Sequence, residues 1–98
     1  MDLLQNLRKE IDEIDNSLVN LLAKRFQICA QVIKYKNQHN IPMMQPERVQ
    51  IVKNRFVELA KKNGIPENFA YTFIDTIISA SCEYEEDILN SLKKKEIS

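Results

Sequence analysis

Residues 4–25, LQNLRKEIDEIDNSLVNLLAKR, decide the fold, because apolar side chains recur there at alternating steps of three and four. The apolar positions are Leu4, Leu7, Ile11, Ile14, Leu18 and Leu21, and the pattern continues through Ile28, Val32 and Tyr35. Such spacing is typical of an α-helix that buries one stripe of its surface. We therefore predict a helix from about residue 3 to about residue 38.

This predicted helix is too long for the chain to cover by itself. At about 1.5 Å per residue it measures roughly 50 Å, about twice the width of a compact globule of this size. The chain has 98 residues, and those outside the helix are too few to hide its whole apolar stripe. A short chain also gains core when a second chain joins it. We therefore expect an intertwined homodimer in which a second copy of the helix lies alongside the first.

Glycine and proline mark the ends of two further helices. The single glycine and the three prolines cluster at 42–46 and 64–66. The second helix is predicted to begin at Gln45-Pro46-Glu47, where a proline and an acid favour a first helical turn, and to end at Asn63-Gly64, which fits a helix C-cap. The third helix is predicted to begin at Pro66-Glu67. No stretch shows the period of a strand. The sequence thus predicts an all-α fold with three helices in one domain over residues 1–98.

Composition argues against several classes of protein. Hydrophobic residues make up 44% and charged residues 29% of the chain, and 14 basic side chains balance 14 acidic ones. This balance gives no overall field to attract nucleic acid or an anionic membrane, and we interpret the lysines at 93–95 as a solvated helix end. Two cysteines without metal-ligand spacing and a charged N-terminal segment indicate a reduced cytoplasmic protein without a signal peptide or membrane span.

Polar side chains interrupt the apolar stripes. The series of the first helix reaches position 25 after Leu21, and the residue there is Arg25. Lys36 lies three helical turns later and projects from the same face, with Cys29 and Val32 between the two cations. Two cations beside an apolar floor can hold a multiply charged anion. Alternatively, both side chains reach solvent or pair with structural acids.

The other two predicted helices add polar groups. The apolar stripe of the third helix runs into Ser81 and Glu85, so a hydroxyl and a carboxyl point inward. They complete a polar pocket, or Glu85 forms a buried ion pair with Arg25 or Lys36. Arg48 lies at the start of the second helix, where backbone amides favour anions; the alternative is an exposed arginine paired with a nearby acid.

Arg8 cannot join Arg25 within one chain. The two arginines are seventeen positions apart, which on a straight helix means about 25 Å and roughly 100° of rotation. Arg8 is therefore an ordinary surface arginine, or it reaches the Arg25 pocket of the other subunit in an antiparallel dimer.

Taken together, these residues resemble the all-α chorismate mutase family along nearly the whole chain. The resemblance rests on LRKEIDEID at 7–15, LLAKR at 21–25, Lys36, Arg48, and Ile77-Ile78 with Ser81 and Glu85. It implies a three-helix protomer, an intertwined dimer with two active sites, and neither a cofactor nor a metal. It also implies that Arg25 with Ser81 binds one carboxylate of the substrate, that Arg8 of the partner subunit binds the other, and that Arg48 assists at the rim.

The resemblance further places Lys36 and Glu85 beside the ether oxygen of the breaking bond. Conversion of chorismate to prephenate is a pericyclic rearrangement that needs no nucleophile. It needs a cavity that holds the reactive conformation and donors at the oxygen where negative charge develops. Relatives commonly have glutamine where Glu85 stands, and a carboxyl group donates a hydrogen bond only when protonated. Burial beside a dianion favours the protonated form and the nearby cations oppose it, so the sequence leaves its state open.

Two further departures concern the substrate. Many chorismate mutases have acidic residues at the positions of Gln45 and Val49 to hold the C4 hydroxyl. The string Pro46-Glu47-Arg48-Val49 is closer to isochorismate pyruvate lyases and 4-amino-4-deoxychorismate mutases. We predict a cytoplasmic chorismate mutase in aromatic amino-acid or related metabolism, with those two activities as alternatives. An alternative of another class is a non-catalytic helical dimer whose polar core residues only fix the register.

Overall fold

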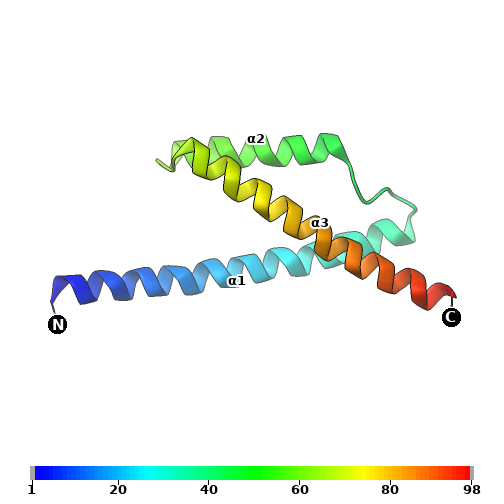
Figure 1. Cartoon of the computed structure of the whole chain (residues 1–98), viewed down its shortest axis with the longest axis horizontal. Coiled ribbons are helices and arrows are strands. Elements are labelled where there is room, and N and C mark those ends of the chain that lie inside the picture. Colours follow the sequence, from blue (N-terminus) through cyan, green and yellow to red (C-terminus); the bar gives the residue numbers. More distant parts are fainter. Residues whose placement is uncertain (1, 98) are drawn as a thin grey trace.

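The computed structural model describes residues 2–97, and over this range the protein consists of three α-helices without a strand (Figure 1). The first helix, α1, spans Leu3–Gln38, α2 spans Pro46–Lys62 and α3 spans Glu67–Ile97. These bounds agree closely with the predicted ones, and the all-α fold class is confirmed.

The ends of α1 are fixed by local hydrogen bonds. At the N-terminus the Asp2 carboxylate accepts a hydrogen bond from the backbone N–H of Gln5 at 2.8 Å, which satisfies one of the free amides of the first turn. At the C-terminus Asn40 adopts a left-handed conformation with φ 56°. The N–H of Ile41 then donates to the Lys36 carbonyl at 2.9 Å. The chain therefore leaves α1 in a defined direction just after Gln38.

The second helix begins and ends at the predicted signals. Pro46 lies in its first turn, and Gln45 stands before it but makes no side-chain capping bond. At the other end Gly64 has φ +74°, and the N–H of Ile65 donates to the Ala60 carbonyl at 2.9 Å. A positive φ suits glycine because it has no Cβ to clash with the backbone. This turn reverses the chain into α3.

The core lies where α3 packs against its neighbours. α3 contacts α1 over one part of its length and α2 over another (Figure 1). Between α2 and α3 the buried residues are Val57, Ala60, Ala70 and Ile74, flanked by Val52, Phe56, Ile77 and Ile78. Alanines in the middle of this set let the two helices approach closely. On α1 the corresponding buried residue is Ile33.

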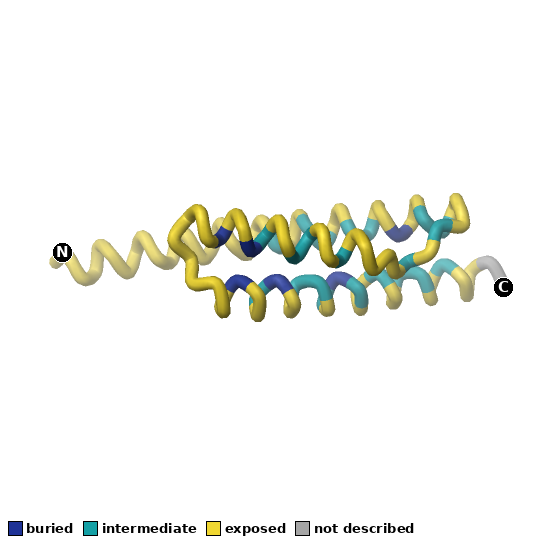
Figure 2. The backbone as a smooth tube through the Cα atoms, turned by 90° about the horizontal axis from the view of Figure 1, so that it is seen from above, coloured by how far each residue is buried: buried dark blue, intermediate teal, exposed yellow. Residues whose placement is uncertain are grey.

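The N-terminal half of α1 extends beyond the rest of the molecule. The protein measures 61 × 29 × 16 Å, and Figure 2 shows the free end of α1 exposed along its length. The apolar residues Leu3, Leu4, Leu7, Ile11, Ile14 and Leu18 are 43–71% exposed. A single chain thus leaves the predicted stripe uncovered, which is the condition on which the dimer prediction rests.

Over residues 2–97, no helix is both long enough and apolar enough to cross a membrane. The cytoplasmic location stays a prediction.

Candidate active site

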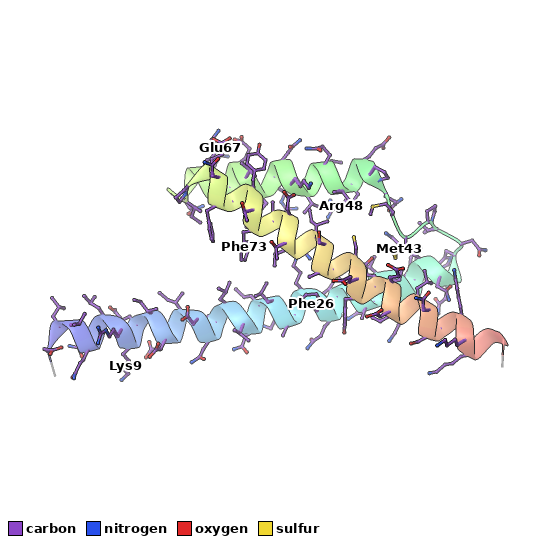
Figure 3. The ribbon with its side chains drawn as sticks, viewed as in Figure 1. Lys9, Phe26, Met43, Arg48, Glu67 and Phe73 are labelled. Carbon is purple, nitrogen blue, oxygen red and sulfur yellow. The ribbon has the colours of Figure 1, made fainter. Side chains whose placement is uncertain are left out.

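A cavity of about 500 Å³ lies among all three helices and the loop that precedes α2. Its lining includes every site residue predicted for one chain except Arg8: Arg25, Lys36, Gln45, Arg48, Val49, Ser81 and Glu85. Figure 3 shows Met43 in the loop and Arg48 at the start of α2, at the end of the molecule where α1 also ends. The fold therefore brings together residues that are up to sixty positions apart in the sequence.

Arg25 is held in place by a buried hydroxyl. Its Nη1 donates to Ser81 Oγ at 2.6 Å and, more weakly, to Cys29 Sγ at 3.9 Å. Ser81 in turn donates from Oγ to the Ile77 carbonyl at 2.7 Å, and its residue is only 7% exposed. Both bonds fix the guanidinium through one nitrogen. The other N–H groups of Arg25 remain available for an anion in the cavity.

Lys36 is oriented by the loop. Its Nζ donates to the Met43 carbonyl at 3.0 Å, which uses one of the three N–H bonds of the ammonium group. Met43 and Met44 both line the cavity. The loop before α2 is therefore part of the cavity wall.

The cavity carries more positive than negative charge. Lys24, Arg25, Lys36 and Arg48 line it, whereas Glu85 is the one acid among its described lining residues. Ion pairs join Lys53 to Asp75 at 2.8 Å and Lys61 to Glu58 at 3.8 Å, and neither pair includes a residue that lines the cavity. The structure therefore does not contain the pairing of Glu85 with Arg25 or Lys36 that the sequence allowed.

Cys29 lies on the floor of the cavity, one helical turn after Arg25. Burial raises the pKa of the Cys29 thiol, and the nearby Glu85 carboxylate raises it further, whereas a hydrogen bond with Ser81 and the charge of Arg25 act in the opposite direction. The net shift of the pKa is upward, so the group is a neutral thiol at neutral pH.

Sequence reasoning missed Lys24 and Cys82, which also line the cavity. For Cys82 the signal was its place directly after Ser81. Lys24 carried no comparable signal, because it lies off the apolar stripe of α1.

Arg8 lies away from this cavity. It belongs to the exposed N-terminal half of α1 and does not line the cavity. The structure therefore agrees with the helical geometry, which keeps Arg8 and Arg25 of one chain apart.

Comparison with known proteins identifies the family of this chain. The sequence model of the family described as chorismate mutase type II matches residues 7–86. The chain is 36% identical over 87 residues to the 4-amino-4-deoxychorismate mutase of Streptomyces venezuelae, covering 89% of this chain and 84% of that protein. It is 32% identical over 92 residues to the chorismate mutase of Methanocaldococcus jannaschii, covering 94% and 93%. A match to the T-protein of Haemophilus influenzae, 44% identical over 66 residues, spans 66% of this chain and 17% of that protein. This chain belongs to the chorismate mutase type II family, and it is an isomerase with chorismate mutase activity.

Proposed function

We propose that the cavity binds chorismate as a dianion and holds it in the conformation that rearranges to prephenate. The observation that carries the proposal is the set of cations from two helices around one cavity, with Glu85 as the one acid in the described lining. A rearrangement without a nucleophile is accelerated by positioning and by fixed donors, and this cavity offers both.

Arg25 and Ser81 are the proposed carboxylate-binding pair. The 2.6 Å bond between them fixes the guanidinium before the substrate arrives. A planar guanidinium matches the two oxygens of a carboxylate, so little reorganisation is needed on binding. Arg48, in the first turn of α2, adds a second cation where backbone amides also favour negative charge.

Lys36 and Glu85 are the proposed donors to the ether oxygen. The Met43 carbonyl restrains Lys36 Nζ and leaves its remaining N–H bonds for the substrate. Negative charge develops on the ether oxygen as the bond breaks, and a lysine placed there stabilises the transition state more than the ground state. Glu85 contributes only in its protonated form.

The second substrate carboxylate needs Arg8 from another subunit. The uncovered apolar stripe of α1 supports a homodimer, and a twofold dimer brings the same helix of each subunit to the other. Mixing an Arg8→Ala chain with an Arg25→Ala chain tests this arrangement. Each heterodimer then contains one intact site, so about one quarter of the wild-type activity returns on equal mixing. If Arg8 acted within its own chain, no activity would return.

The ring substituent defines a second candidate function. Gln45 and Val49 line the cavity without adding a carboxylate, and two relatives are named 4-amino-4-deoxychorismate mutase, one from Streptomyces venezuelae and one from Streptomyces pristinaespiralis. The amide of Gln45 can accept from a hydroxyl or an amino group. We therefore propose chorismate as the substrate and 4-amino-4-deoxychorismate as the alternative, with isochorismate cleavage as a third activity on the same fold.

The experiment presents the purified protein with each of the three compounds in turn and identifies the products by chromatography. Formation of prephenate with the highest kcat/KM supports the proposal. A higher kcat/KM for 4-amino-4-deoxychorismate would favour the alternative. Conversion of isochorismate to salicylate and pyruvate, with chorismate and 4-amino-4-deoxychorismate left unchanged, would contradict both rearrangements. The non-catalytic alternative requires that none of the three compounds reacts.

A further inference from the structure

A second cavity of about 390 Å³ adjoins the active site. The two cavities share Leu21, Arg25, Arg48 and Val52. Beyond these residues the second cavity is lined mainly by apolar side chains of the three helices, and one further charged group enters it, Arg55 of α2. An apolar groove edged by arginine suits a segment that is apolar and acidic.

The uncovered half of α1 has this composition. Its apolar stripe is flanked by acids, and between residues 2 and 15 five acidic side chains outnumber two basic ones: Asp2, Glu10, Asp12, Glu13 and Asp15 against Arg8 and Lys9. Asp12 and Asp15 follow Arg8 by four and seven positions. Residues at this spacing share one face of a helix. The two aspartates and Arg8 therefore point toward neighbouring parts of the same surface.

Symmetry then fixes which cavity the aspartates meet. If Arg8 of the partner subunit reaches the cavity at Arg25, a closed twofold dimer requires the two α1 helices to run antiparallel. Moving from position 8 to position 15 along the partner helix advances about 10 Å toward the N-terminus of the first α1. On that helix the same step leads from Arg25 to Leu18, which lines the second cavity.

Among the described residues of one chain, the charged groups in question have no ion-pair partner. Arg55, Asp12 and Asp15 are all exposed, and neither ion pair found within residues 2–97 includes them. We propose that Arg55 pairs across the dimer interface with the acidic face formed by Asp12 and Asp15 of the partner subunit, inside the second cavity. This inference rests on the proposed function, because it takes its register from Arg8 acting in the other subunit's site.

The experiment measures dimer dissociation by sedimentation of the full chain at several concentrations. Charge reversal by Arg55→Glu should raise the dissociation constant about tenfold or more, because it places like charges together in a desolvated groove. Arg55→Gln, a milder change, should have a smaller effect of the same sign. Lys62→Glu is the matched control: Lys62 is exposed on the same helix but lines neither cavity, and its reversal should leave the constant unchanged.

A charge swap identifies the partner residues. Asp12→Lys with Asp15→Lys should weaken the dimer alone and restore it when combined with Arg55→Glu. Wild-type dissociation in Arg55→Glu, or no recovery in the swap, would overturn the ion pair while leaving the dimer and the role of Arg8 intact. A wild-type protein that is monomeric at every concentration would overturn both this inference and the dimer on which it depends.

Discussion

Replacing Ser81 with alanine removes the hydroxyl that holds Arg25, and its effect follows from the geometry. Ser81 Oγ accepts from Arg25 Nη1 at 2.6 Å, and a hydrogen bond to a charged group contributes about 1.5–3 kcal/mol. If the guanidinium that Ser81 no longer holds loses a substrate bond of this size in the transition state, kcat/KM falls roughly 10- to 140-fold, since about 1.4 kcal/mol corresponds to a factor of ten.

The same substitution should lower the free energy of unfolding, mainly through the lost bond to Arg25, which the folded protein makes without a ligand. The other bond of Ser81 runs to the Ile77 carbonyl in its own helix, and such bonds to the preceding turn add little to helix stability. We expect the free energy of unfolding to fall by about 3 kcal/mol or less. Ser79→Ala is the matched control, because Ser79 lies in the same helix, is exposed and does not line the cavity.

A double-mutant cycle with Arg25→Met separates positioning from general damage. Steady-state kinetics on chorismate would give kcat/KM for the wild type, both single variants and the double variant. If Ser81 acts through Arg25, Ser81→Ala costs less than about threefold once Arg25 is methionine. Equal losses in both backgrounds would refute the reasoning and assign Ser81 a separate contact with the substrate.

Three further predictions address the proton, the thiol and the turn. A glutamine amide donates a hydrogen bond at every pH, so Glu85→Gln should retain or raise kcat/KM on chorismate whereas Glu85→Ala should lower it; an equal loss in both variants would exclude Glu85 from the role. Burial raises the pKa of Cys29, so in a Cys82→Ser background iodoacetamide should react with it more slowly at pH 7 than with a small free thiol; an equal rate would contradict a protected neutral thiol. Gly64 has φ +74°, and an added Cβ would meet nothing within 4 Å, so Gly64→Ala should lower the unfolding free energy in urea by about 1 kcal/mol through the backbone alone, and an unchanged midpoint would show that the turn relaxes.

The helix boundaries were predictable because their causes are local. Pro46 and Gly64 act through their own backbone conformations, and Arg25 stands out because it interrupts a regular apolar series. Such local signals do not depend on contacts with distant parts of the chain.

The remaining parts of the site depend on contacts between distant segments. The bond from Lys36 to the Met43 carbonyl exists because Asn40 turns the chain back toward α1. A pattern of side chains does not predict which backbone carbonyl will accept a hydrogen bond. The absence of an ion pair at Glu85 within the described residues likewise follows from how α3 crosses α1. A sequence can show which side chains face inward but not which of them come within bonding distance.

The unusual length of α1 and the positive charge of the cavity have a common explanation. Cations gathered around one cavity repel each other, and the described part of the chain offers Glu85 as the single acid among them, so a bound dianion relieves a cost that folding alone leaves in place. The N-terminal half of α1 is likewise left with its apolar stripe uncovered, and a second copy of the chain in the proposed dimer would relieve that cost. One helix therefore carries both incomplete features: in the dimer that we propose, Arg25 and Lys36 in its second half form the site of its own subunit, and Arg8 in its first half completes the site of the other. On this account, the helix is long because a single element has to serve two active sites.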